Sequence, residues 1–561
     1  MRVIRSGGGP VPDVHDTPPT SSGTGPTKAG AGPSPWAPPP QPPPPPRGPG
    51  AGTVKPAPAS AATLWCALAT GVLSALLLGD GAGLNLLIVA VPAGLGAYFA
   101  ARAADRRMRP WTLVWALGGV ALLAVPVLRD AGWPTFLAVV SSLSLASLAL
   151  NGGRTWPGVL LGPLGLPGSL GTGMVSGWRG LRTHAASSNG RVAPVLRTGA
   201  VAALLLIVFG ALFAGADAAF ADLLGSLIPD VSVSDGPWRF LLLLLGVVGA
   251  LAAARLATAP LRWDRLRIRP GRARSRWEWA LPLVVLDLLF AAFIAVQLAV
   301  LFGGYDKVLS ETGLTYSEYA RQGFWQLLFA TLLTLAVIAL ATRWAPRSTA
   351  GDRTLVRAVL GALCLLTLVV VASALRRMDL YVDAYGLTRL RVSVTAMELW
   401  LGLVIVLIMA AGVYGVKWLP RAVAASGAAA VLAFGLASPD GLVAERNVQR
   451  YERTGKIDID YLEKLSADAV PALDGLPEPL RTCALEDMAR DLEETDEPWY
   501  ATSWGEYRAR DILSGHGAAD RMSCDPYDSD RYGEYDRDGY GDRDGYGEWE
   551  QEGEIRPSDD Y

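Results

Sequence analysis

The sequence has little of what metal and nucleotide sites are made from. Its 561 residues include only three histidines, His15, His184 and His516, and four cysteines. None of the histidines lies in a long apolar run, so we do not expect haem, zinc or copper ligands inside a membrane. No Walker A, HExxH or GxSxG motif is present, which disfavours ATP-driven transport by this chain. The sequence therefore predicts no cofactor and no metal site.

Charged residues are also scarce. They make up 18% of the chain and apolar residues 51%, whereas soluble domains contain about 25% charged residues. The charge is uneven, because residues 441–561 carry 32 acidic and 14 basic side chains, leaving 20 acidic and 36 basic ones in 1–440. The basic residues lie in short loops between apolar runs, so the expected partner is a lipid bilayer and not a nucleic acid. Arginine outnumbers lysine 44 to 6, which indicates a GC-rich bacterium.

Long apolar runs alternate with polar loops from about residue 61 to residue 437. A helix needs about 20 residues to cross the hydrocarbon core, and a backbone in lipid must satisfy its own hydrogen bonds. The sequence therefore predicts an all-α polytopic membrane protein with about eleven transmembrane helices. The predicted spans are 62–78, 84–101, 111–127, 135–150, 195–213, 238–256, 279–301, 324–341, 355–375, 397–416 and 422–437.

The rest of the chain divides into three further parts around the transmembrane domain 61–440. Residues 1–60 contain 18 prolines and predict a disordered arm. Residues 441–515 have helical patterning and predict a small helical unit, whereas 516–561, rich in Asp, Gly and Tyr, predict a disordered tail. If this region lies outside the cytoplasm, Cys483 and Cys524 could form a disulfide; inside, they would be free thiols.

Loop charges predict the orientation. With the N-terminus inside, the inner loops hold 23 basic residues and the outer loops 8, as the positive-inside rule requires. Four of the outer eight, Arg376, Arg377, Arg389 and Arg391, depart from the rule. An odd number of helices then places the C-terminal tail outside a bacterial plasma membrane.

A few polar residues stand out as candidates for function. Asp287 lies within a predicted span, where it would be a proton or cation site or a helix-packing hydrogen bond. Glu398 lies near the outer end of its span and is expected to reach water. The outer segment 376–391 contains Asp383, Tyr385 and Arg391, and predicts either a folded structure at the interface or a binding site for an anionic group. The glycine-rich residues 152–180 predict an interfacial or re-entrant loop.

Four stretches carry a resemblance to a known family. They are FAGADAAFADLL at 213–224, which includes Asp217; the YARxGF motif at 319–324, which includes Arg321; YGLTRLR at 385–391; and DIDYLEKLSADAVPAL at 458–473, preceded by Asn447 and Tyr451. In these residues the chain resembles a bacterial family of multi-pass membrane proteins that carry a domain of unknown function. The resemblance implies a polytopic membrane protein and supplies no catalytic residue.

Three functions remain open at this point. The first is a non-enzymatic sensor, scaffold or envelope component that acts through its outer loops and tail. The second is a secondary transporter that uses Asp287. The third is a membrane enzyme for a lipid-linked substrate, which would need a pocket that joins Asp217, Asp383 and Arg391.

Overall fold

The computed structural model describes most of the chain between residues 58 and 515. The described ranges are 58–106, 109–187, 236–266, 275–303, 316–345, 349–495 and 497–515, with single residues between 198 and 217, and only the backbone of 185–187, 299–303 and 316–324. These residues all belong to one compact unit, Pro56–Tyr561. Most of the predicted arm, the predicted tail and most of the predicted span 195–213 lie outside the described residues.

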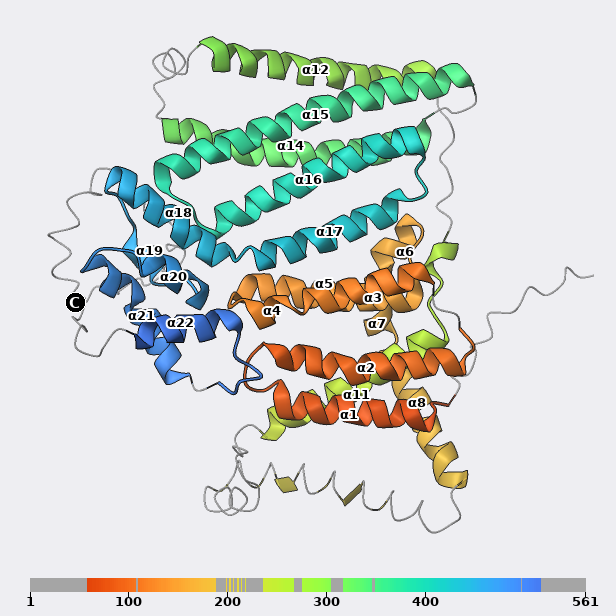
Figure 1. Cartoon of the computed structure of the whole chain (residues 1–561). Helices are drawn as coiled ribbons and strands as arrows, with labels where there is room; N and C mark the ends of the chain where they lie inside the picture. The colour runs from red at the N-terminus through yellow and green to blue at the C-terminus, as the bar shows by residue number, and fades with distance from the viewer. Residues whose placement is uncertain are drawn as a thin grey trace, which may run out of the picture. The chain divides into compact units, whose positions relative to one another are not determined.

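All regular elements in the described ranges are helices (Figure 1). Nine of them are long and apolar enough to cross a membrane, which confirms the prediction of an all-α polytopic membrane protein. The count of eleven is not confirmed, because α1 (Ala61–Leu77) has only 17 residues and the span 195–213 is not described. The nine are α2 (Leu84–Ala103), α3 with α4 (Pro110–Leu122 and Val125–Leu128), α5 (Gly132–Asn151), α11 (Gly236–Thr258), α12 (Arg276–Gly303), α14 (Tyr316–Trp344), α15 (Ala350–Tyr385), α16 (Arg389–Tyr414) and α17 (Leu419–Leu436).

Helices α1, α2, α3, α5 and α11 form a first bundle. Small residues let its helices approach closely, as is common where lipid replaces water. A Cβ atom at Gly246 of α11 would lie 2.9 Å from the Cα atom of Gly71 on α1. The glycines of this pair are therefore needed for the packing of α1 against α11.

Helices α12, α14, α15 and α16 form a second bundle around a buried core that includes Trp279, Ile338, Leu363 and Ile405. Helix α17 connects the bundles, because it packs against α16 on one side and against α3 and α5 on the other. Helix α15 has 36 residues and is about 54 Å long, so it continues well beyond the hydrocarbon core. The helix therefore extends ten residues past the predicted end of the membrane span at residue 375.

The glycine-rich residues 152–180, between α5 and α11 in the sequence, are largely helical, and their bent helix pair is either a broken span or a re-entrant loop, so the predicted re-entrant loop stays a prediction. They form α6 (Trp156–Leu161), η1 (Gly162–Leu164), α7 (Gly165–Gly168) and α8 (Leu170–Ser187), with a bend of 46° between the α6–α7 segment and α8. Gly173 explains part of this composition, because a Cβ atom there would lie 2.7 Å from the backbone of Ala252 on α11. The glycines thus serve helix packing.

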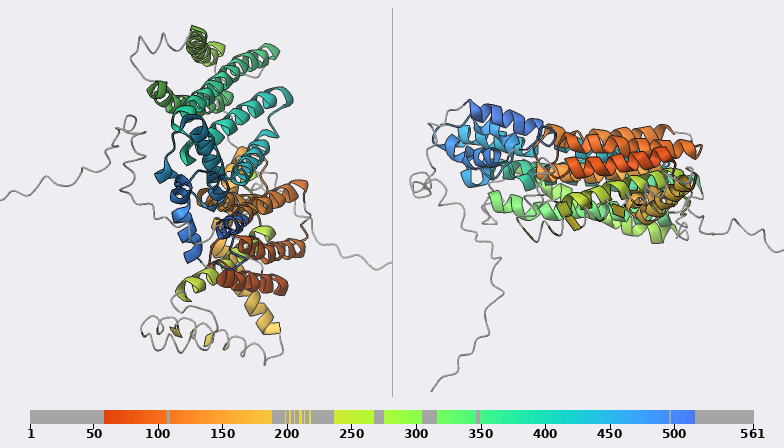
Figure 2. Two further views of the ribbon diagram at one scale, coloured as in Figure 1. Left: turned by 60° about the vertical axis from the view of Figure 1, so that its left-hand side comes forward. Right: turned by 90° about the horizontal axis from the view of Figure 1, so that it is seen from below.

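Residues 438–515 fold over one end of the helices, and we call this part the cap (Figures 1 and 2). Its own apolar core includes Val443, Leu462, Leu473, Leu485 and Met488, so burial of these side chains holds it together. Its elements are α18 (Pro439–Thr454), α19 (Ile459–Leu462), η4 (Ala467–Ala469), α20 (Val470–Leu473), α21 (Leu480–Glu494) and α22 (Trp504–Ser514).

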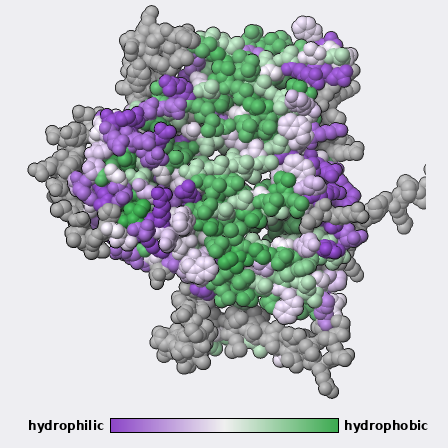
Figure 3. Space-filling view, in the orientation of Figure 1, coloured by the Kyte–Doolittle hydropathy of each residue, from purple (hydrophilic) through white to green (hydrophobic). Residues whose placement is uncertain are grey.

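An apolar band crosses both bundles between two polar ends (Figure 3). The cap covers one end, and the other end carries arginines of the interhelical loops, such as Arg106, Arg154 and Arg262, with the short helix η3 (Trp263–Arg265). This pattern is what a bilayer around the band would select, because charged groups are costly within hydrocarbon.

Candidate functional site

The turn between α15 and α16 carries the YGLTRLR stretch. Gly386 ends α15 with a φ of 80°, a conformation that favours glycine, and the Thr388 hydroxyl accepts a hydrogen bond from the Arg391 amide to cap α16. The Arg391 guanidinium donates to the carbonyl oxygens of Tyr385 and Gly386. It also lies 4.2 Å from the centroid of the Tyr381 ring. Arg391 therefore fixes the shape of the turn.

The cap binds this turn through its backbone. Asn447 of α18 donates to the Leu387 carbonyl oxygen at 2.8 Å and accepts from the Leu387 amide at 3.3 Å. Tyr461 of α19 accepts a hydrogen bond of 2.8 Å from the Arg389 amide. Two stretches that carried the family resemblance, YGLTRLR and the one that follows Asn447, thus contact each other.

A bidentate ion pair reinforces the contact with the second bundle. The Arg389 guanidinium donates to both carboxylate oxygens of Asp440, at 2.8 and 2.6 Å. The Asp440 side chain is only 7% exposed, and it also accepts a hydrogen bond of 2.9 Å from the Ser466 amide. Planar guanidinium and carboxylate groups match in this geometry, which makes the pair strong and directional.

The next residue of the cap binds the first bundle. Asp130, in the loop between α4 and α5, accepts a hydrogen bond of 3.0 Å from the Ala467 amide. One residue further, Asp468 accepts a hydrogen bond of 2.6 Å from the Ser438 hydroxyl, at the break between α17 and α18. We call the residues Ser466–Asp468 the hub, because Ala467 binds the first bundle while Ser466 and Asp468 on either side bind Asp440 and Ser438 at the start of α18.

Helix α22 packs closely against the hub. A Cβ atom at Gly505 of α22 would overlap the Asp468 carboxylate and would lie 3.2 Å from the Asp130 amide nitrogen. Only glycine fits here without displacing a neighbour, so α22 lies directly against the hub. The sequence contains no local signal for this contact.

A further contact joins the cap to α1, α2 and α11. Asp80, in the loop between α1 and α2, forms an ion pair of 3.0 Å with Arg239 of α11 and accepts a hydrogen bond of 3.0 Å from the Tyr500 hydroxyl. The Tyr500 carbonyl oxygen accepts a hydrogen bond of 2.9 Å from the Asn85 amide at the start of α2. The cap therefore contacts both bundles. We use the name junction for all contacts of the cap with the two bundles, which include those of Asp80, Asp130 and Arg389.

Carboxyl groups at the junction bind protons more tightly than exposed ones. Burial raises the pKa of Asp130 and of Asp468 above their usual range. Burial and the neighbouring Asp130 carboxylate raise the pKa of Glu506 to about 7, and burial also raises the pKa of Glu497. The cause is physical, because a low-dielectric surrounding disfavours the charged form.

Among the described residues, no hydrogen bond or ion pair joins the candidates Asp383 and Arg391. Asp383 is exposed on the last turn of α15, whereas Arg391 faces the turn carbonyls and Tyr381. The Tyr385 ring packs against Tyr381, with 5.2 Å between their centroids. Asp217 is exposed in a stretch of which only single residues are described. The Arg321 side chain lies outside the described residues, although its backbone belongs to α14.

Two carboxyl groups lie within the second bundle. Glu398 is fully buried, so the expectation that it reaches water was wrong: α16 begins at Arg389 and not near Glu398. One of its oxygens, Oε1, lies 3.3 Å from the Thr331 hydroxyl of α14. Asp287 lies on α12, with one buried oxygen that has no hydrogen-bond partner. In the described ranges, no three His, Cys, Asp or Glu side chains are placed to hold a metal ion.

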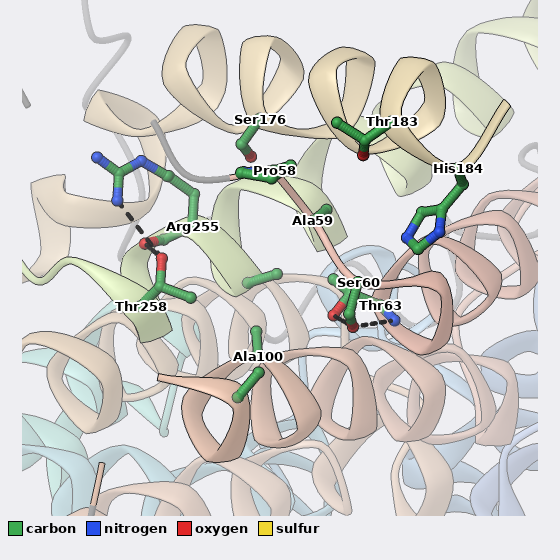
Figure 4. Close-up of a pocket in the computed structure, with 12 residues that line it drawn as sticks. Pro58, Ala59, Ser60, Thr63, Ala100, Ser176, Thr183, His184, Arg255 and Thr258 are labelled. Carbon is green, nitrogen blue, oxygen red and sulfur yellow. Dashed lines mark hydrogen bonds between the residues drawn. The ribbon is translucent and has the colours of Figure 1, made fainter. Parts of the chain in front are cut away.

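A cavity of about 270 Å³ lies at the opposite end, between α1, α2, α8 and α11 (Figure 4). Ser176, Thr183 and His184 line it from α8, opposite Ser60 and Thr63 at the start of α1. The Ser176 and Thr183 hydroxyls already donate to carbonyl oxygens of their own helix, at 2.7 and 2.9 Å. The hydroxyls of Ser176 and Thr183 are therefore already engaged within α8.

The cysteines differ in state. Cys66 on α1 and Cys364 on α15 are free thiols, whereas Cys483 of α21 is disulfide-bonded. Its predicted partner, Cys524, lies outside the described residues, so the pairing of these two stays a prediction.

Sequence reasoning missed most of the junction. Asp80, Asp130, Asp440, Asp468 and Glu506 were not among the predicted candidates. For Asp440 a signal existed, because Ser438 followed by Pro439 is typical of a helix start and places Asp440 in the first turn. The contacts of Asp130 and Asp468 depend on tertiary structure alone.

The comparisons with known proteins give one family and no function. A domain of unknown function, DUF4153, matches residues 116–476, which include the second bundle, the α15–α16 turn and the hub. No curated protein and no solved structure matches the chain.

Proposed function

Since the chain belongs to the DUF4153 family, whose domain has no known function, we propose its role from the geometry of the junction. The protein is a non-enzymatic sensor of the bacterial cell envelope, in which the cap detects a change outside the plasma membrane and passes it to the membrane helices. The observation that carries this proposal is that the cap contacts both bundles, because Ala467 binds Asp130 of the first bundle and Asp440 binds Arg389 of the second.

The proposal places the cap outside the membrane. The arginine-rich loops at the other end of the helices support this sidedness, because basic residues are retained in the cytoplasm. The disulfide of Cys483 supports it as well, since disulfides persist mainly in oxidising compartments.

The junction suits signal transmission because its contacts are polar and short. Arg389 and Asp440 hold the cap to the second bundle, and Asp130 holds it to the first. A force, ligand or proton that shifts Asp440 or Ala467 in the cap lengthens one of these contacts. Such a shift changes the position of one bundle relative to the other.

Distance measurements across the junction test this proposal. Spin labels at Trp133 of α5 and Leu390 of α16, which are 57% and 61% exposed, report the separation of the bundles in nanodiscs. We expect a narrow distance distribution in the parent protein and a broad one in the double variant Asp130→Ala, Asp440→Ala. The matched control is Asp511→Ala, an exposed cap residue. If the double variant kept the narrow distribution, the cap would not couple the bundles.

The two alternatives differ in their support. A membrane enzyme would need Asp217, Asp383 and Arg391 in one pocket, and the contacts of Arg391 direct it to the turn instead. A secondary transporter would need protonatable groups within the membrane, and Asp287 with Glu398 favours this second candidate.

A further inference from the structure

Glu398 is the most deeply buried acidic side chain in the described residues. Its exposed fraction is 0%, and it lies nine residues after the start of α16 at Arg389, about 13 Å along the helix. It belongs to one of the helices that cross the apolar band. The Glu398 side chain is therefore surrounded by the membrane helices and contacts neither water nor the cap.

The hydrogen bonds of Glu398 do not suit a carboxylate. Its Oε2 atom has no hydrogen-bond partner, and Oε1 has only the Thr331 hydroxyl at 3.3 Å. That hydroxyl has one proton and lies closer, at 3.0 Å, to the Leu327 carbonyl oxygen of its own helix. None of the ion pairs among the described side chains involves Glu398. A buried charge without a counter-ion or a full set of donors is strongly disfavoured.

A neutral Glu398 satisfies the same geometry. If Oε1 carries a proton, the carboxylic acid can donate it across the 3.3 Å contact to the Thr331 oxygen, because the Thr331 hydroxyl can donate its own proton to the Leu327 carbonyl oxygen. Each proton then has one acceptor, and the chain of donors ends at a backbone carbonyl, as buried polar groups require.

From this arrangement we propose that Glu398 and Thr331 form an intramembrane proton-binding site between α16 and α14, which is occupied at neutral pH and exchanges its proton with water when the helices move. The proton is the ligand, Glu398 holds it, and Thr331 accepts its hydrogen bond. This site goes beyond the sensor role of the cap, because no junction residue takes part in it.

Another polar contact joins two helices of the same bundle. The Ser373 hydroxyl of α15 donates to Gln297 of α12 at 3.1 Å. The second bundle therefore includes polar contacts between helices, among them Glu398 with Thr331 and Ser373 with Gln297.

Infrared spectroscopy in nanodiscs tests the proposal, because a protonated carboxyl group absorbs at a distinctly higher frequency than a carboxylate. We expect a carboxylic acid band at pH 8 that shifts on labelling with ¹³C-glutamate, is lost in Glu398→Gln and shifts in D₂O as the proton exchanges. The control Asp287→Asn should retain this band. In Thr331→Val the band should move to a higher frequency, because the hydrogen bond to the threonine oxygen is removed.

Three results would overturn the proposal. Absence of a glutamic acid band from the labelled parent protein would mean that Glu398 is ionised. A band that stayed unshifted after days in D₂O would mean a sealed structural hydrogen bond. An unchanged band in Thr331→Val would mean that Thr331 is not the partner. The isotope shift is measured in the parent protein, so the test does not depend on the folding of a variant.

Discussion

Asp130 and Ala467 are 337 residues apart in the sequence, yet the Asp130 carboxylate accepts a hydrogen bond of 3.0 Å from the Ala467 amide. This one contact joins the loop between α4 and α5 to the hub of the cap. Ser466 beside it donates to Asp440, which pairs with Arg389 of α16, so the hub also lies next to the contact of the cap with the second bundle.

Removal of the Asp130 carboxylate should weaken cap docking. In Asp130→Ala the Ala467 amide keeps its burial and loses its partner, which costs about 1–3 kcal/mol. We expect faster hydrogen–deuterium exchange in a peptide that covers residues 463–470, whereas Asp511→Ala should leave this exchange unchanged. Equal exchange in both variants would show that water or another group replaces the carboxylate.

The junction should become less stable as the pH rises. The pKa of Glu506 is raised to about 7 by burial and by Asp130, and Glu497 raises it further while Arg510 lowers it. A raised pKa means that the docked cap binds the proton more tightly than the released cap. The protonated Glu506 therefore stabilises the docked cap fully at pH values below the ordinary pKa of glutamate. This contribution is lost as the pH rises through about 7. The raised pKa values of Asp130 and Asp468 act in the same direction.

Cap exchange measured at pH 5.5 and pH 8 checks this sign. We expect slower exchange of the hub amides at pH 5.5 after correction for the intrinsic rates. One carboxyl group changes an opening equilibrium by at most about tenfold per pH unit. Glu506→Gln should flatten the profile. Faster corrected exchange at the lower pH would contradict the prediction.

The membrane helices could be predicted because hydropathy is a local property. The apolar run around Leu241 to Leu245 is long enough to cross lipid. It predicts a span at 238–256, and the structure has α11 at Gly236–Thr258. The end of α15 could not be found in this way, since hydropathy drops at Arg376 while the helix continues to Tyr385. Backbone hydrogen bonds propagate a helix regardless of side-chain polarity, so the polar segment 376–385 stays helical.

The junction could not be predicted from one sequence, because its partners are far apart along the chain. Arg389 stood out in the sequence as a basic residue of a predicted outer loop. Its pairing with Asp440, however, depends on the fold of the cap. Glu398 shows the opposite error. It was recognised as a candidate, and its burial was missed because the predicted span began at 397, whereas the helix begins eight residues earlier, at Arg389.

Gly386 should be the most sensitive position of the α15–α16 turn. Its φ of 80° costs an L-amino acid about 1–2 kcal/mol, and a Cβ atom there would overlap the Asn447 side chain. Gly386→Ala should therefore lower the thermal unfolding temperature of the cap. The control is Gly361→Ala on the same helix, where a Cβ atom would have no neighbour within 4 Å. A similar shift in both variants would argue against a special role of the turn.

Thiol labelling tests the sidedness of the cap together with its disulfide. Cys483 is bonded, while Cys66 and Cys364 are free within the membrane helices. We expect a membrane-impermeant maleimide to label Cys483 and Cys524 in intact cells only after treatment with an impermeant reductant. Cys483→Ser should expose Cys524 to the reagent without reduction, because its predicted partner is gone. Labelling that required permeabilised cells would place the cap inside and reverse the orientation of every helix.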